Sequence, residues 1–175
     1  MIKKLSSRTV YENKWMKVRE DDVAFPDGTR SIYGVVEKPH FALIIPYKKG
    51  HFYLVRQYRY PVRAAFWEFP QGSYEEQPGV DPRELARKEL KEETGLAAGE
   101  IIKLGFLYEA CGFSNQGFYV FLARDFTQGD QELEHSEQGM EVGRFSQKEF
   151  EAMVQRGEVT DAPTVAAYGL LKMTE

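Results

Sequence analysis

The feature that most constrains this chain is the segment from 81 to 95, which has the marks of one well-delimited helix. Asp81 precedes Pro82, and this pair is a typical helix start because aspartate caps free backbone N–H groups and proline suits the first helical position. Glu84 stands where the partner of a capping box would be. No breaker follows until Gly95, which favours the left-handed stop of a helix. The sequence therefore predicts a helix whose two ends are both defined by local chemistry.

Acidic residues are concentrated on one side of this predicted helix. Glu89 lies one turn before both Glu92 and Glu93, so two or three carboxylates project together. Like charges at this spacing cost about 0.2–0.5 kcal/mol per pair, and a divalent cation would turn that cost into attraction. The alternative is a solvated acidic face, since Lys88 can pair with Glu84 and Glu92 at helical spacing.

The segment before the helix favours the metal interpretation. An apolar strand ends at Pro70-Gln71-Gly72, and a loop that contains Glu75 and Glu76 then leads directly into the acidic helix. A strand, a loop and a carboxylate-bearing helix form a suitable cradle for Mg²⁺, which takes oxygen ligands and keeps its other positions for water and phosphate. The expected ligands are the helix carboxylates and one backbone carbonyl: Glu89, Glu92, Glu93 and Gln71.

Cations gather just before this cradle. The continuous apolar run 41–47 predicts a strand buried on both faces, and 52–60 predicts its neighbour, which ends in alternating cations and aromatics. Arg56 and Arg59 on this second strand favour diphosphate binding, because a planar guanidinium holds phosphate oxygens better than lysine does. The alternative is that these arginines pair with Glu68 and the acids of the loop.

Two polar loops follow the acidic helix. Strands are expected over 101–109 and 118–123, and the loop 110–117 between them is either a ligand loop or a plain hairpin connection. A longer acidic loop covers 130–138 and precedes a strand at 140–145.

The two ends of the chain have clear local signals. Segments 15–25 and 31–36 predict an antiparallel hairpin joined by a Pro-Asp-Gly turn. Trp15 in this hairpin is either an ordinary core or interface aromatic or a ligand contact. Near the C-terminus, the capping residues Ser146 and Asp161 predict the starts of two helices.

Composition excludes several classes of protein. The 175 residues are 42% hydrophobic and 14% aromatic, which suits one globular domain with a core. The net charge of -4 argues against a general nucleic-acid or membrane-surface binder. Cys111 is the single cysteine, so no intrachain disulfide can form and a reducing cytoplasm is expected. The start of the chain has no apolar run, so neither a signal peptide nor a membrane span is predicted.

The acidic helix and its entry carry a family resemblance. Gly72, followed by Lys-Glu-Leu-Lys-Glu-Glu-Thr-Gly-Leu at 88–96, resembles the Nudix box, in which a glycine loop leads into an Arg-Glu-hydrophobic-x-Glu-Glu-x-Gly-hydrophobic helix. A lysine stands where the family's helix has its arginine, and the loop is longer than the pattern. Val80 falls at the place of the family's loop glutamate, a role for which Glu75 and Glu76 are the shifted candidates.

The resemblance extends over nearly the whole chain, to Nudix hydrolases of the ADP-ribose pyrophosphatase and nucleoside-diphosphate-sugar hydrolase type. It implies the α/β class, with a Nudix α/β/α sandwich around a central mixed β-sheet and an N-terminal antiparallel hairpin. It also implies a single domain over 1–175, in which 1–38 form the hairpin and the contact of a homodimer and 39–175 form the catalytic core.

The resemblance further implies roles for individual residues. Glu92 and Glu93 would be catalytic as well as metal-binding. Glu137 in the acidic loop is the predicted general base, and Glu134 is the second choice. Substrate contacts are predicted at five side chains: Arg59, Arg56, Glu68, Gln116 and Trp15.

The implied function is Mg²⁺-dependent hydrolysis of the diphosphate bond in ADP-ribose or a nucleoside-diphosphate sugar, giving a nucleoside monophosphate and a sugar phosphate; Mn²⁺ is expected to substitute. Cys111 and Gln116 stand where the ADP-ribose subgroup has a proline and an acid, which favours a broader nucleotide-sugar preference. The alternatives are a house-cleaning nucleoside-triphosphate pyrophosphohydrolase and a non-catalytic nucleotide-binding module. The leading hairpin argues against the first, and the intact set of helix carboxylates argues against the second.

Overall fold

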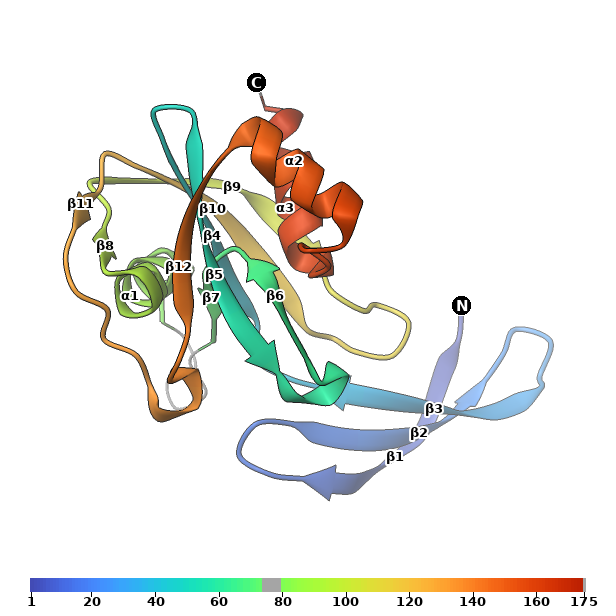
Figure 1. The fold of residues 1–175 in the computed structure, drawn as a ribbon. Coiled ribbons are helices and arrows are strands. Elements are labelled where there is room, and N and C mark those ends of the chain that lie inside the picture. The colour runs from blue at the N-terminus through green and yellow to red at the C-terminus, as the bar shows by residue number, and fades with distance from the viewer. Residues whose placement is uncertain (74–79, 175) are drawn as a thin grey trace.

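A mixed β-sheet forms the centre of the protein (Figure 1). The computed structural model describes residues 1–73 and 80–174, and in these residues the central sheet has seven strands. Five run in the order β12-β5-β4-β10-β9, while β6 pairs with β5 and β7 pairs with β4. β4 and β10 are parallel, and the other pairs are antiparallel. The strands are β4 (Phe41–Lys48), β5 (His51–Arg59), β6 (Ala64–Glu68), β7 (Gln71–Gly72), β9 (Glu100–Tyr108), β10 (Gly117–Arg124) and β12 (Glu141–Ser146).

Helices cover both faces of this sheet. Helix α1 (Pro82–Thr94) lies on one face, and α2 (Gln147–Arg156) and α3 (Ala162–Lys172) lie on the other (Figure 1). β4 shows how one strand serves both layers, because Leu43 packs toward α2 and α3 while its neighbour Ile44 packs toward α1. Both residues are fully buried, as expected for a strand covered on both faces. The predicted α/β/α sandwich with a mixed sheet is confirmed.

The ends of the helices follow local sequence signals. The side chain of Asp81 accepts a hydrogen bond from the backbone N–H of Arg83, and Gly95 ends α1 with a φ of 72°. Glu84 does not complete the expected capping box; it lies 3.8 Å from Arg87, one turn further along the helix. The capping box that opens α2 is present as predicted, and Asp161 caps α3.

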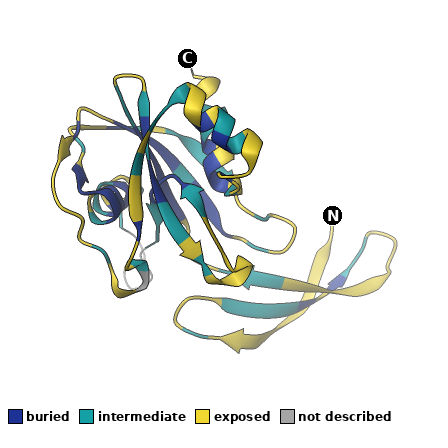
Figure 2. Cartoon of the chain, in the orientation of Figure 1, coloured by how far each residue is buried: buried dark blue, intermediate teal, exposed yellow. Residues whose placement is uncertain are grey.

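The N-terminal part is a sheet of its own, which contains the predicted antiparallel hairpin and one further strand. In the described N-terminal residues it has three antiparallel strands: β1 (Lys3–Glu12), β2 (Lys17–Ala24) and β3 (Arg30–Glu37). The hairpin over β2 and β3 was predicted, but β1 was missed. Every residue of β1 is exposed (Figure 2), so its sequence has no alternation of apolar and polar residues to mark it as a strand. Its backbone pairs with β2 along the whole strand, and cross-strand polar pairs such as Arg8 with Glu20 add to this pairing.

Two short elements place the segment that leads to β12. β11 (Thr127–Gln128) pairs with β8 (Leu96–Ala97), just after α1. The segment after β11 runs down the edge of the molecule and turns back into β12 (Figure 1). A 3₁₀ turn, η2 (His135–Glu137), lies in this segment. Among the described residues, no helix has the length and apolarity needed to cross a membrane.

Candidate active site

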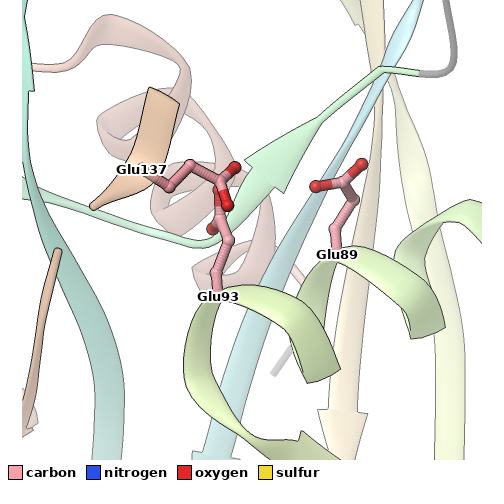
Figure 3. Close-up of side chains that lie close together, drawn as sticks. All are labelled: Glu89, Glu93 and Glu137. Atoms are coloured by element: carbon pink, nitrogen blue, oxygen red, sulfur yellow. The ribbon is translucent and has the colours of Figure 1, made fainter. Parts of the chain in front are cut away.

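Three glutamates converge between α1 and the segment that precedes β12 (Figure 3). Glu89 and Glu93 lie one helical turn apart on α1, and Glu137 approaches them from η2. One carboxylate oxygen from each lies within 4.8 Å of those from the other two. Glu89 and Glu93 are buried, with exposed fractions of 7% and 2%, and Glu137 is half-buried. The helix period brings the first two together, and the tertiary fold adds the third.

Gly72 makes room for this group. A β-carbon at this position would lie 2.3 Å from Oε2 of Glu89, which is far inside van der Waals contact. β7, to which Gly72 belongs, pairs with β4 and contacts α1. The glycine that precedes the acidic helix in the sequence is therefore needed for the close approach of the Glu89 carboxylate.

Gln71 ties the same strand to the cluster in a way that the sequence did not predict. Its backbone N–H donates a hydrogen bond to Oε2 of Glu93 at 3.1 Å. Its side-chain amide donates to Asp161, the capping residue of α3, at 3.2 Å. Gln71 thus fixes the Glu93 carboxylate through its N–H, and the use of its backbone carbonyl as a metal ligand stays a prediction.

Burial and mutual repulsion set the charge of the cluster. Burial raises the pKa of Glu89 to about 7, and the nearby carboxylates of Glu92 and Glu137 add to this effect. The pKa of Glu93 is raised well above its ordinary value, first by burial and then by Glu89 and Glu137; the hydrogen bond from Gln71 opposes the shift. Without a cation, these carboxyl groups hold protons at a pH where an exposed glutamate has lost its own.

The donor set fits a divalent metal ion. Three carboxylate groups from two elements supply oxygen atoms at a spacing that one small cation could bridge, and oxygen ligands are what Mg²⁺ prefers. Because Gly72 has no side chain, the Glu89 carboxylate fits against it and lies within the cluster. A bound cation would also offset the cost of burying like charges, which raises the pKa values of Glu89 and Glu93.

Arg59 and Glu68 form an ion pair next to the cluster. Nη2 of Arg59 lies 2.5 Å from Oε1 of Glu68, and Nε lies 3.2 Å from Oε2, so the contact is bidentate. Glu68 is 1% exposed, and its burial raises its pKa to about 7 against the opposing effect of Arg59. The alternative from the sequence, in which an arginine pairs with Glu68, is what the structure shows. Glu68 holds Arg59, whose side chain remains 37% exposed.

Some predicted residues lie apart from the three-carboxylate cluster. The carboxylate of Glu92 lies 3.2 Å from Nζ of Lys88, so the helix acids do not all gather at one point. The side chain of Glu134 takes part in the capping box of η2. Arg56 pairs with Glu141 on β12 at 2.9 Å, and both side chains are exposed. Glu75 and Glu76 lie outside the residues that the structure describes.

Gln116 and Trp15 do not belong to the carboxylate cluster. Gln116 is buried, and its side-chain amide donates to the backbone carbonyl of Pro39 at 2.8 Å, which fastens the 110–117 loop to the link between β3 and β4. Trp15 is half exposed in the turn between β1 and β2. It lines a cavity of about 450 Å³ together with Lys38 and Asn115, so the N-terminal sheet and the loop share one hollow.

Sequence reasoning missed one residue near the site. Asp161 appeared only as the cap of α3, but it also accepts the hydrogen bond from the side chain of Gln71 and contributes to the electrostatic environment of Arg59 and Glu68. Its helix-start signal accounts fully for an aspartate at this position, so no local pattern distinguishes its second contact.

Comparison with known families agrees with this geometry. Residues 37–168 match the family model described as "NUDIX domain", and residues 2–36 match "Nucleoside diphosphate sugar hydrolase N-terminal domain". The chain belongs to the Nudix family. It is therefore a hydrolase, a Nudix pyrophosphatase, and Nudix hydrolases generally depend on a divalent metal. The resemblance stated from the acidic helix and its glycine is confirmed.

Two similar proteins and one solved structure align with most of this chain. It is 29% identical over 175 residues to the ADP-ribose pyrophosphatase of Bacillus subtilis (strain 168), covering 99% of this chain and 94% of that one. It is 32% identical over 166 residues to the ADP-ribose pyrophosphatase of Mycobacterium tuberculosis (strain ATCC 25618 / H37Rv), covering 93% and 79%. A crystal structure of an ADP compounds hydrolase has the same fold, with a TM-score of 0.87 at 22% identity over 98% of this chain and 92% of the other.

Proposed function

We propose that this Nudix hydrolase cleaves the diphosphate bond of ADP-ribose or a related nucleoside-diphosphate sugar, with Mg²⁺ as its metal and Mn²⁺ as a substitute. The products are a nucleoside monophosphate and a sugar phosphate. The observation that carries the proposal is the convergence of Glu89, Glu93 and Glu137 beside Gly72. The relatives named ADP-ribose pyrophosphatase support the substrate class.

The residues of the cluster take separate roles in this proposal. Glu89 and Glu93 hold the metal, and Glu92 joins them when the metal and substrate are bound. When present, the metal neutralises phosphoryl oxygens and makes water more acidic. Glu137 removes the proton from the attacking water, because it is the carboxylate of the cluster that comes from outside α1 and is the least buried of the three.

The substrate would extend from the cluster toward the arginine pair. Arg59 is held in one geometry by Glu68, and its guanidinium lies near enough to Glu93 to interact with it electrostatically. A pre-positioned guanidinium binds a diphosphate with little loss of side-chain freedom. In our proposal Arg59 contacts the diphosphate, while Glu68 acts by positioning Arg59.

The N-terminal sheet would serve a homodimer. Its exposed apolar side chains include Leu5, Val10, Tyr11 and Ile32, and such side chains are commonly buried at subunit contacts. Trp15 would then stack on the base of the nucleotide. A monomeric mass in analytical ultracentrifugation would contradict the dimer. We also propose a cytoplasmic location, in keeping with a single exposed thiol at Cys111.

A substrate panel tests the reaction. The wild-type protein and the Glu93→Gln variant are incubated with Mg²⁺ and ADP-ribose, several nucleotide sugars, a dinucleoside polyphosphate and nucleoside triphosphates, and products are identified by ³¹P NMR. We expect the wild type alone to yield a nucleoside monophosphate and a sugar phosphate. Release of inorganic pyrophosphate from triphosphates, with no turnover of ADP-ribose or nucleotide sugars, would contradict the proposal.

A further inference from the structure

A polar groove lies on the α1 side of the sheet, apart from the carboxylate cluster. It consists of two cavities, of about 260 and 390 Å³, that share Tyr53, Gln128 and Arg144 in their linings and therefore adjoin each other. As far as the chain is described, neither lining includes a glutamate of the cluster. We call this feature the Tyr53 groove. Nothing in the proposed reaction uses it.

The smaller cavity of the groove is lined by three cations. Lys48 is the last residue of β4, Lys49 lies in the turn that follows it, and Arg144 comes from β12. In a chain with a net charge of -4, no described carboxylate forms an ion pair with any of the three. Cations gathered around a hollow without acidic partners attract an anion, and a phosphate group matches both ammonium and guanidinium donors.

One of these cations is held in place by the fold, and another lies beside a histidine ring. Nζ of Lys48 donates to the backbone carbonyl of Phe126 at 2.6 Å and lies 5.1 Å from the centre of the Phe126 ring. An ammonium group has further donors to offer after this contact. Nη2 of Arg144 lies 3.1 Å from Nδ1 of His51, and the same nitrogen lies 2.8 Å from the carbonyl oxygen of Lys49, so it accepts from Arg144 or donates to Lys49 but cannot do both. Positioned donors of this kind lose less freedom on binding than fully solvated side chains do.

The larger cavity is lined by groups suited to hydroxyls. Gln128 uses its Nε2 to donate to the backbone carbonyls of Thr94 and Gly129, which leaves its Oε1 as an acceptor. Gln131 likewise donates through Nε2 to the carbonyl of Glu93 at 2.6 Å. Asp130 adds a carboxylate to the same lining. A molecule with several hydroxyl groups could therefore donate to this end of the groove.

We propose that the Tyr53 groove binds a sugar phosphate. The phosphate group lies in the smaller cavity among Lys48, Lys49 and Arg144, and the hydroxyl-bearing carbon skeleton lies in the larger one. Tyr53 lines both cavities and flanks the junction between the two halves of the ligand.

The position of the groove links it to the segment that carries Glu137. The larger cavity is lined by the start of that segment, at 128–131, and by the strand that follows it, at 142–144. The start is fastened to the end of α1, because the N–H of Gly129 donates to the carbonyl of Gly95 at 2.8 Å. A ligand that contacts both ends of the segment would stabilise the part between them, which includes Glu137.

Binding to metal-free protein tests the proposal independently of catalysis. Isothermal titration calorimetry in EDTA compares ribose 5-phosphate with inorganic phosphate, so that no metal ion at the cluster can bind either ligand. We expect ribose 5-phosphate to bind more tightly than phosphate. Because each cation contributes a charge-assisted hydrogen bond, Arg144→Gln and Lys48→Met should each weaken binding by about tenfold or more. Lys148→Gln, on the exposed surface of α2, is the matched control and should bind as the wild type does.

Several results would overturn the proposal. No binding to the metal-free wild type, or binding that Arg144→Gln and Lys48→Met leave unchanged, would show that the groove is not the site. Equal affinities for ribose 5-phosphate and phosphate would refute the role of the larger cavity. Hydrogen exchange should slow over residues 131–140 when ribose 5-phosphate binds, and unchanged exchange would refute the link to Glu137. The Glu93→Gln variant should bind normally, so failure of the proposed hydrolysis would leave this test intact.

Discussion

Two buried acids in this protein have pKa values that are shifted in opposite directions. Asp21 on the N-terminal sheet and Glu93 on α1 have similar exposed fractions, 6% and 2%. Hydrogen bonds from Arg19 and Ser7 lower the pKa of Asp21. Burial beside other carboxylates raises the pKa of Glu93 well above its ordinary value. The depth of burial and the partners that the fold supplies together decide the charge of an acid.

The direction of the pKa shift separates Asp21, which is ion-paired within the fold, from Glu89 and Glu93, whose charge a bound ligand would balance. On the N-terminal sheet, arginines pair with acids within β2 and across the strands, while β1 remains exposed throughout (Figure 2). On α1, the fold buries Glu89 and Glu93 in the interior without a positive side chain bonded to either carboxylate among the described residues. A protein tolerates such a cost at a functional site, where a ligand supplies the missing charge.

The largest expected effect is loss of activity in Glu93→Gln. The amide keeps the size of the side chain and can still accept the hydrogen bond from Gln71, but it cannot supply a negative charge to the metal. We expect kcat to fall by roughly 10³-fold or more, as for the loss of a metal-binding carboxylate. Steady-state assays with saturating Mg²⁺ measure this loss, and full turnover under these conditions would show that the cluster is not the catalytic centre.

The stability of the Glu93→Gln variant provides a second test of the comparison between Asp21 and Glu93. Removing one of several buried acids relieves desolvation and repulsion, so the metal-free Glu93→Gln protein should have a Tm equal to or above that of the wild type. Glu92→Gln is the matched comparison for stability on the same helix, and the smaller burial of Glu92 and its contact with Lys88 predict a smaller change in Tm. Equal changes in Tm in the two metal-free variants would show that burial does not distinguish the two acids.

The next effect in size is expected for Glu137→Gln. If Glu137 removes the proton from the attacking water, its loss lowers kcat by roughly 10²- to 10⁴-fold. The pH profile of kcat should also lose its acidic limb, because that limb reports the protonation of the base. Glu134→Gln serves as the control from the same segment. A larger loss in Glu134→Gln than in Glu137→Gln would reverse the assignment.

The raised pKa values predict how stability depends on pH and metal. The pKa of Glu89 is about 7 in the folded chain against an ordinary value of 4.5, so the folded protein holds a proton that the unfolded chain has released. In the metal-free protein, stability from this group is therefore lost as pH rises from about 4.5 through about 7, by roughly 3 kcal/mol in total. The shifted pKa of Glu93 acts in the same direction.

Thermal unfolding measured at about pH 5 and pH 8, with and without metal, checks this prediction. The increase in Tm caused by Mg²⁺ or Mn²⁺ should be larger at the higher pH, because protons compete for the same oxygens at the lower pH. An increase in Tm that is equal at both pH values would mean that the metal binds elsewhere.

The smallest effect on activity is expected for Asp21→Asn. The substitution breaks the ion pair with Arg19 and weakens the hydrogen bond from Ser7, so Tm should fall by a few degrees while kcat stays unchanged. Because the folded pKa of Asp21 is lowered, its stabilisation is present above the ordinary pKa of an aspartate and is lost as pH falls through the folded value. The Tm difference between wild type and variant should therefore vanish in acid. A large loss of kcat would place the N-terminal sheet in the catalytic machinery.

The sequence determined the elements that depend on neighbouring residues. Asp81, Pro82 and Gly95 specify the ends of α1 through caps and backbone geometry, which act within a few residues. Once that helix exists, its period places Glu89 and Glu93 on one side. The buried strands were predictable for the same reason, since a continuous apolar run marks a strand covered on both faces.

Only the tertiary structure decided which partners these elements meet. β1 was invisible to hydrophobic patterning because it buries no face. Glu137, rather than Glu92, completes the carboxylate group because the segment between β11 and β12 returns to the face of α1, and Asp161 joins Gln71 because α3 begins there. These contacts join residues that are far apart in the chain. The chemistry of each residue could be predicted from the sequence, but its neighbours in space depended on tertiary packing.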